Sequence, residues 1–251
     1  CLAYKLQVLD RSGVAGAVLV GTALFGFGGI PGGAVLLLFF LSSSLLSRFQ
    51  TVRKEPLAEK FTKGHQRDLA QALGNGAVAA IAAALYALTE VTWAWAAVVG
   101  ALAAANADTW ATELGVLSPR LPRLITTGRP VSIGTSGGIT ASGSFAALAG
   151  AASIAGLAGW LRPGAAPALL LAVGTIGGLA GAMFDSLLGA SLQAIYWCDD
   201  CAKETEHHPH HRCGQTTRQL RGLVWLQNDW VNFFATLVGA LLAGGIFSTL
   251  V

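Results

Sequence analysis

The chain has 251 residues, of which 53% are hydrophobic and only 12% charged, whereas soluble proteins carry about 25% charged residues. Together with a mean hydropathy of +0.58, this composition excludes an ordinary soluble domain and predicts an integral membrane protein. The net charge of only +3 also argues against a general nucleic-acid binder.

The apolar stretches are continuous runs of Ala, Leu, Val and Gly, whereas a transmembrane β-barrel needs short segments of alternating polarity. A helix needs ~20 residues to cross the bilayer. We therefore predict an all-α polytopic bundle, a single domain over residues 1–251, with about seven transmembrane helices at 12–30, 33–47, 74–91, 93–107, 138–160, 166–192 and 230–250. The segments 33–47 and 93–107 are short, so either could be re-entrant.

Short turns and long polar segments alternate between these helices. Brief turns are expected at 28–33, 89–90 and 162–164. The longer segments are a basic loop at 48–73, an Arg- and Gly-rich loop at 115–137 and a Cys- and His-rich loop at 197–227. This arrangement puts fifteen of the sixteen Lys and Arg residues on one side and only Arg162 on the other. The positive-inside rule then predicts a cytoplasmic N-terminus and a C-terminus on the opposite side.

Four acidic residues fall at the cytoplasmic ends of the predicted helices, namely Asp108, Glu113, Asp185 and Asp229. Ionisable groups at membrane depth are candidates for function, although each alone could simply snorkel or cap its helix. Asp108 and Glu113 are five positions apart, roughly 140° around an ideal helix, so they cannot both bind one ion on a regular helix. Either the helix breaks near Glu113, or one carboxylate binds a metal and the other orients a basic residue or a substrate proton. Carboxylate oxygens suit Mg²⁺. An interhelical contact of Asp108 with Thr112 is the structural alternative.

The Arg- and Gly-rich loop has the composition of a phosphate site. Three arginines, Arg120, Arg123 and Arg129, precede a helix start that carries Thr135, Ser136, Gly137 and Gly138. Arginine pairs with phosphate oxygens, and glycines let backbone N–H groups approach at a helix N-terminus. The stretch is not a Walker motif, because the required lysine is missing. A flexible loop with topogenic arginines is the alternative.

Further polar residues are spaced to line the same cavity. Arg67, Gln71 and Asn75 recur every four positions before the third predicted span, and Asn228 and Asn232 flank Asp229 at the start of the last one. Thr109 shares a helix face with Glu113. Capping of the last span by Asn228 or Asp229 is an alternative role for these residues.

The third polar loop carries ligands suited to a closed Zn²⁺ site. The candidate ligands are Cys198, Cys201, Cys213 and one of the histidines in 207–211, for which we take His211. A cytoplasmic location disfavours a structural disulfide. The spacing between the second and third cysteines is not that of a standard zinc finger, so free or redox-active thiols remain the alternative. Zinc would fold the loop and would not catalyse.

These motifs, in this order, resemble the transmembrane protein 19 family, which includes plant and cyanobacterial phytyl-phosphate kinases. The resembling positions cover nearly the whole chain, at 39–44, 67–76, 106–115, 120–138, 185–193, Cys198, Cys201, 213–214 and 228–232. The resemblance implies phosphorylation of an isoprenoid monophosphate to the diphosphate, in the synthesis of tocopherol and related prenyl lipids. A more distant similarity to CTP-dependent phytol and dolichol kinases and to phosphatidate cytidylyltransferases favours CTP as the donor.

We therefore predict a Mg²⁺-dependent membrane phosphotransferase that acts on phytyl or a related prenyl monophosphate with CTP or another nucleoside triphosphate. We expect its site on the cytoplasmic or stromal side of a bacterial inner membrane or a plastid membrane. The expected catalytic residues are Asp108, Glu113, Asp185 and Arg129, with Asp108 and Asp185 as Mg²⁺ ligands. The alternatives are a CTP-dependent prenyl alcohol kinase, a cytidylyltransferase, a transporter of phosphate or prenyl lipids, and a non-catalytic scaffold.

Overall fold

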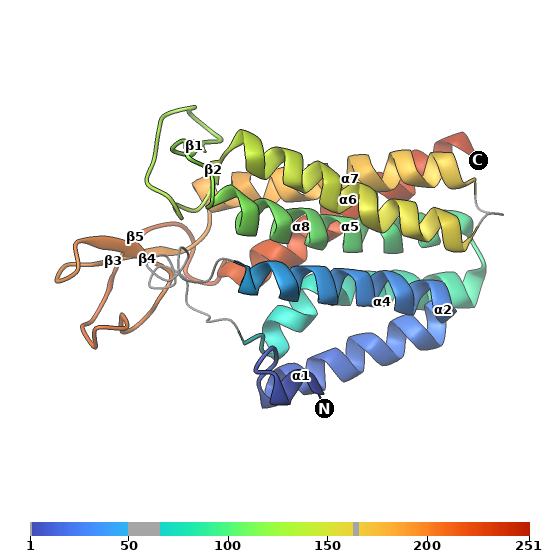
Figure 1. Cartoon of the computed structure of the whole chain (residues 1–251), viewed down its shortest axis with the longest axis horizontal. Coiled ribbons are helices and arrows are strands. Elements are labelled where there is room, and N and C mark those ends of the chain that lie inside the picture. Colours follow the sequence, from blue (N-terminus) through green and yellow to red (C-terminus); the bar gives the residue numbers. More distant parts are fainter. Residues whose placement is uncertain (1, 50–65, 163–165) are drawn as a thin grey trace.

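The computed structural model describes residues 2–49, 66–162 and 166–251, most of which form long helices packed side by side (Figure 1). The helices are α1 (Leu2–Lys5), α2 (Arg11–Arg48), α4 (Leu69–Thr89), α5 (Thr92–Gly115), α6 (Ala141–Leu161), α7 (Pro167–Ser191) and α8 (Asn228–Leu250). Two small sheets are made of β1 (Arg123–Leu124) with β2 (Gly138–Ile139), and of β3 (Ile195–Cys198) between β4 (Lys203–Thr205) and β5 (Arg218–Arg221). Five helices, α2, α4, α6, α7 and α8, are long and apolar enough to cross a membrane. The predicted all-α integral membrane architecture is thus supported.

α2 is a helical hairpin that contains the first two predicted spans. Its backbone leaves the helical conformation at Gly29, where φ is 63°, and Pro31 follows inside the element. Figure 1 shows the two halves running in opposite directions. A β-carbon on Gly32 would lie 2.5 Å from the carbonyl oxygen of Leu24, so the close approach of the halves requires glycine there. The halves of α2 and the helices α4 to α8 match the predicted segments in order. The number of membrane crossings and the side of the N-terminus stay predictions.

α5 is the central helix of the bundle. It packs against α2, α4, α6, α7 and α8, and residues 94–107 are all buried. Because other helices surround it, α5 does not need the apolar surface of a lipid-facing span and can carry polar groups. Asn106 is fully buried, and its Nδ2 donates to the carbonyl oxygen of Gly150 at 2.8 Å and to Ser153 Oγ at 3.2 Å. Its Oδ1 accepts from Ser42 Oγ at 3.0 Å, which joins α5 to both α6 and α2.

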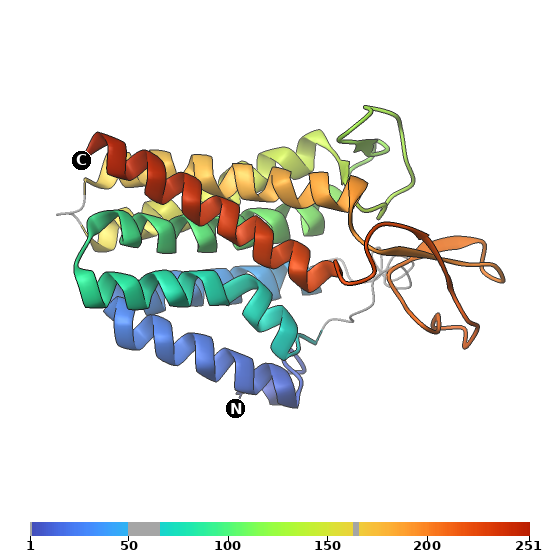
Figure 2. The same cartoon turned by 180° about the vertical axis from the view of Figure 1, so that it is seen from behind.

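The strands and long loops gather at one end of the bundle, opposite the C-terminus (Figure 1). Figure 2 shows α8, in red, running from that loop end to the other end. At the far end α4 ends at its C-cap residue Glu90, which has the left-handed conformation with φ of 57°. At the same end the guanidinium of Arg162 lies 4.7 Å from the ring centre of Tyr86 and 4.5 Å from the ring centre of Trp95. Within the described part of the chain, the long loops 116–140 and 192–227 and the short turn at Glu90 follow the predicted alternation. Residues 163–165 of the third turn lie outside the described part.

Helix α4 begins earlier than predicted, at Leu69 instead of position 74. Asp68 accepts a hydrogen bond from the backbone N–H of Gln71 at 2.9 Å, and the Gln71 side chain accepts in return from the Asp68 N–H at 3.3 Å. This capping box starts the helix inside the segment expected to be a basic loop. Residues 50–65 of that loop lie outside the described part.

The membrane side of the loop end can be tested by thiol labelling. Ile30, 78% exposed in the α2 hairpin, and Arg218, exposed on β5, lie at opposite ends of the molecule. We expect an impermeant maleimide added to intact cells to label Ile30→Cys and to spare Arg218→Cys, because basic segments stay in the cytoplasm. Labelling is quantified for each peptide by mass spectrometry, with permeabilised cells as the control. Labelling of position 218 in intact cells would reverse the predicted orientation.

Candidate phosphate and cation site

A cavity of about 390 Å³ lies at the loop end of the bundle. It is lined by residues of α2, α4, α5, α6, α7 and α8 and by the glycine-rich segment before α6. The residues predicted from sequence that line it are Arg67, Gln71, Asn75, Asp108, Thr109, Glu113, Thr135, Ser136, Gly137, Gly138, Asp185, Asn228, Asp229 and Asn232. Segments far apart in the sequence thus meet at one site, as the common depth of their polar residues indicated.

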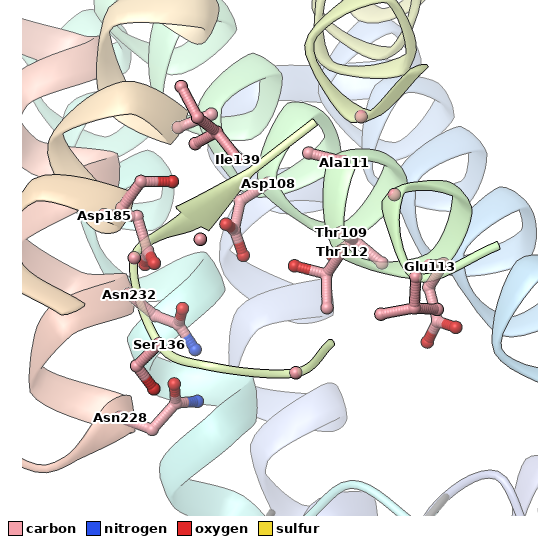
Figure 3. Close-up of a pocket in the computed structure, with 18 of the residues that line it drawn as sticks. Asp108, Thr109, Ala111, Thr112, Glu113, Ser136, Ile139, Asp185, Asn228 and Asn232 are labelled. Carbon is pink, nitrogen blue, oxygen red and sulfur yellow. The ribbon is translucent and has the colours of Figure 1, made fainter. Parts of the chain in front are cut away.

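Two carboxylates from different helices face each other in this cavity. Figure 3 shows Asp108 of α5 and Asp185 of α7 directed into the same space, with Asn232 of α8 beside Asp185. The Oδ2 atom of Asp185 is buried and has no hydrogen-bond partner among the described residues. A buried carboxylate stays ionised only when a cation or hydrogen-bond donors compensate its charge. The pair could therefore hold a cation, for which the amide oxygens of Asn228 and Asn232 in the same cavity would offer further hard ligands.

Glu113 lies apart from this pair. α5 remains helical through Gly115, so the first of the two alternatives, a helix break near Glu113, is excluded. Figure 3 shows its side chain directed away from Asp108. Ser47 Oγ donates to Glu113 Oε1 at 2.6 Å, and Glu113 attracts the guanidinium of Arg67. Glu113 thus belongs with a basic residue and not with the Asp108 and Asp185 pair.

Arg67 is the one Lys or Arg residue among the described residues that line the cavity. Its guanidinium lies 5.5 Å from the ring centre of Phe39 and 5.9 Å from that of Phe40. Burial lowers the pKa of Arg67 from its ordinary value, and the charge of Glu113 partly offsets this effect. Because the ordinary pKa of arginine lies far above neutral pH, the group stays protonated and supplies a fixed positive charge.

α4 and α8 approach each other closely beside the carboxylates. A β-carbon on Gly74 would lie 2.7 Å from the carbonyl oxygen of Asp229, and Thr236 Oγ1 donates to the carbonyl oxygen of Gly74 at 3.3 Å. This contact brings the start of α8 next to Asn75, one residue after Gly74. The polar residues of both helix starts thereby share one wall of the cavity.

The glycine-rich segment before α6 is fixed on α7. Gly134 and Gly137 have φ of 78° and 81°, in the left-handed region that glycine adopts without strain. A β-carbon on Gly137 would lie 2.6 Å from the Cα of Ala190, so the segment packs directly on the α7 backbone. Thr140 Oγ1 accepts from the N–H of Gly143 at 3.0 Å and caps α6. Hydroxyls and N–H groups at a helix N-terminus thus border the cavity that holds Asp185.

The three loop arginines do not line this cavity. Arg120, Arg123 and Arg129 are exposed, and Arg123 Nη1 donates to the carbonyl oxygen of Gly128 at 2.8 Å within its own loop. The reason is local: Arg123 pairs with Ile139 in the β1 and β2 sheet and with Pro130 in a further bridge, so residues between them project away from the bundle. The expectation that these arginines and the glycine segment act together is not met in this structure.

Glu206 and Gln193 are among the cavity residues that were not singled out as site residues from the sequence. Glu206, from the Cys- and His-rich loop, lines the cavity and accepts a hydrogen bond at 2.9 Å from Nε2 of Gln193, which is buried. Glu206 stands among polar residues in the sequence and looks like any surface acid. Gln193 is the last residue of the segment 185–193, which resembles the family. Nothing else in the sequence marked it as a site residue.

The Cys- and His-rich loop forms a separate cluster. The ligand atoms of Cys198, Cys201, His211 and Cys213 all lie within 4.8 Å of one another. A backbone hydrogen bond at Gln215, followed by one from His211, lowers the pKa of the Cys213 thiol to about 7. Hydrogen bonding to Cys213, more than burial, raises the pKa of Cys201 to about 11. These are the four residues expected from the sequence as metal ligands.

Comparison with known proteins identifies membrane-protein relatives. The sequence model of the family described as Integral membrane protein DUF92 matches residues 1–240. Protein PGR of Arabidopsis thaliana is 34% identical over 263 residues, covering 95% of this chain and 89% of the relative. An uncharacterized membrane protein of Methanocaldococcus jannaschii is 35% identical over 246 residues, covering 98% and 89%. One of Synechocystis is 26% identical over 249 residues, covering 97% and 84%. No solved structure matches the chain.

Proposed function

The chain belongs to the DUF92 family of integral membrane proteins, and on that premise we propose that it is a membrane isoprenoid-phosphate kinase. It transfers a phosphoryl group from CTP, or another nucleoside triphosphate, to phytyl or a related prenyl monophosphate and yields the diphosphate for tocopherol or other prenyl-lipid synthesis. The observation that carries this proposal is the meeting of Asp108 and Asp185 with a glycine-rich segment in one cavity at the end of the bundle. Such a cavity suits a divalent cation together with phosphates.

Mg²⁺ fits the oxygen-rich donor set of this cavity. Asp108 and Asp185 would hold it, with Asn228, Asp229 and Asn232 as further oxygen ligands or hydrogen-bond partners of its waters. The buried, unpartnered Oδ2 of Asp185 is the observation that supports this fit. When bound, Mg²⁺ would neutralise negative charge on the phosphates.

The chain's own donors would hold the phosphates. Thr135, Ser136 and Gly137 line the cavity just before α6 and offer hydroxyl and backbone groups, whereas the N–H of Gly138 donates to the carbonyl oxygen of Thr135. Arg67 would supply a positive charge, and its guanidinium would be held in place by the attraction of Glu113 and by the Phe39 ring. In this assignment Arg67 takes the phosphate role expected of Arg120, Arg123 and Arg129.

The reaction needs little covalent work from the protein. An oxygen of the acceptor monophosphate attacks the γ-phosphorus, the bond from that phosphorus to the bridging oxygen breaks, and the nucleoside diphosphate leaves with its electron pair. A phosphate monoester has a second pKa of about 6 and is already ionised at neutral pH, so no general base is assigned. Catalysis then consists of positioning and charge neutralisation.

Apolar residues form part of the cavity wall. Ala147 of α6 and Ala182 and Met183 of α7 are among them. Both helices are rich in Gly and Ala along their length. We assign the prenyl chain to this wall, with its phosphate directed toward Asp185 and Ser136.

The proposal is tested with the purified protein in detergent, Mg²⁺, a panel of labelled nucleotides, and phytyl, geranylgeranyl and farnesyl monophosphates. We expect a prenyl diphosphate and CDP in equal amounts, and no turnover without Mg²⁺. Activity on the free alcohols would favour a prenyl alcohol kinase, and release of pyrophosphate with a CDP-lipid would favour a cytidylyltransferase. Flux of phosphate or prenyl phosphate into proteoliposomes without turnover would favour a transporter.

A further inference from the structure

The loop between α7 and α8 holds four ligand groups that neither the cavity nor the proposed reaction uses. We propose that they form a structural Zn²⁺ site made by Cys198, Cys201, His211 and Cys213, and that this site holds Glu206 in the cavity. The zinc site is independent of the proposed function, whereas the role of Glu206 rests on the proposed function.

Two of the six separations between the ligand atoms match tetrahedral zinc, a third is slightly shorter, and all six are within 4.8 Å. With Zn–S bonds of ~2.3 Å and Zn–N bonds of ~2.0 Å, tetrahedral ligand atoms lie roughly 3.5–3.8 Å apart. The Sγ atoms of Cys198 and Cys213 are 3.6 Å apart, and Cys201 Sγ lies 3.6 Å from His211 Nδ1. His211 Nδ1 lies 3.2 Å from Cys213 Sγ, slightly closer than in a filled site. The three cysteines of the described residues form no disulfide.

Two tight turns present the ligands in pairs. Cys198 ends β3 and Cys201 lies in the turn to β4, while His211 and Cys213 lie in a second turn. In that turn the N–H of Gly214 donates to the carbonyl oxygen of His211 at 2.9 Å. The N–H of His211 donates to the carbonyl oxygen of Gln215 at 2.8 Å. The sheet has strands of only four, three and four residues. So small a unit buries too little apolar surface to be stable alone, and a metal commonly compensates.

The segment that carries Glu206 is held at both ends by these two turns, because Glu206 lies between Cys201 and His211. Thr205 is buried beside it on β4, and the N–H of His207 donates to Thr205 Oγ1 at 3.1 Å. Thr217 Oγ1 donates to the carbonyl oxygen of His207 at 2.9 Å. Zinc would therefore fix the backbone on both sides of Glu206, while Gln193 holds its carboxylate at the cavity.

The first test is metal content. We expect elemental analysis of protein purified under reducing conditions to find about one zinc per chain, as a closed four-ligand site requires. Cys213→Ser should lose the zinc, His211→Cys should keep it because four ligands remain, and His210→Ala should keep it because this exposed neighbour is outside the cluster. Folded wild-type protein without zinc and with all thiols reactive, or with iron in its place, would overturn the assignment.

A spectroscopic measurement covers the case in which Cys213→Ser does not fold. Wild-type protein exchanged with Co²⁺ should show thiolate charge-transfer absorption and tetrahedral visible bands, and the same protein with His211→Cys should show a shifted spectrum. An unchanged spectrum in His211→Cys would exclude His211 as a ligand. None of these measurements depends on kinase activity, so the zinc site and the proposed function fail separately.

The role of Glu206 has its own test. Glu206→Gln should retain its zinc but raise the Mg²⁺ concentration for half-maximal activity roughly tenfold or more, as loss of a supporting carboxylate does at other metal sites. Zinc-depleted wild-type protein should show the same rise. If zinc removal left the Mg²⁺ dependence unchanged, the link between zinc and the cavity would be wrong.

Discussion

Asp185→Asn is expected to lower kcat by about 10³-fold or more without unfolding the bundle, since about 1.4 kcal/mol of barrier corresponds to tenfold in rate and losing a metal ligand costs several kcal/mol. The same holds for Asp108→Asn, because both carboxylates face one space (Figure 3). Each substitution keeps the shape of the side chain and removes its charge. In the proposed kinase the negative charge of each aspartate would bind Mg²⁺ beside the phosphates. A neutral amide cannot replace that charge.

Stability should not fall with activity in these variants. A buried charge without compensation costs more than a buried amide, and Asp185 Oδ2 has no hydrogen-bond partner in the described part of the chain. The Tm of metal-free Asp185→Asn should therefore equal or exceed that of the wild type. Asp200→Asn, which changes an exposed acid in the same chain, is the matched control and should keep its activity. Folded Asp108→Asn or Asp185→Asn protein with near-normal kcat at saturating Mg²⁺ would remove these residues from the site.

The sequence was sufficient to predict the helical segments because each is a long apolar run bounded by a local signal. Gly29 and Glu90 are such signals, and both adopt positive φ at the expected turns. The start of α4 was missed because the helix begins at a capping box formed by Asp68 and Gln71, six positions before the predicted start at position 74. A capping box is a hydrogen-bonding pattern, which hydropathy does not register.

The cavity was predictable where residues share a depth in the membrane. Asp108 and Asp185 are far apart in the chain but equally near the loop end of α5 and α7, which run in the same direction, so side-by-side packing of these helices brings the two residues together. The contribution of a long loop does not follow from such a rule. Arg129 and Glu206 lie in loops whose paths are set by small sheets and turns, and the structure directs the arginine outward and the glutamate inward. Their composition alone suggested the reverse.

The packing of the glycine-rich segment gives a second large expected effect. Gly137→Ala should lower kcat/KM by about 10²-fold, since displacing bound groups by roughly 1 Å has that cost. At φ of 81° the new β-carbon would lie 2.6 Å from the Cα of Ala190, so the segment must move away from α7 and carry Ser136 and the N–H groups with it. Backbone atoms of a packed helix cannot yield as a flexible side chain can.

Gly128→Ala separates this packing effect from backbone strain. Gly128 also has positive φ, 67°, but nothing lies within 4 Å of its β-carbon position. In both variants an alanine in the left-handed conformation costs about 1–2 kcal/mol of stability. Only in Gly137→Ala does the new β-carbon also overlap a neighbouring residue, Ala190. We expect Gly128→Ala to keep nearly all activity and both proteins to remain folded by thermal unfolding in detergent. Equal losses in the two variants would assign the effect to strain in the loop, and the contact of Gly137 with α7 would then have no part in positioning the phosphates.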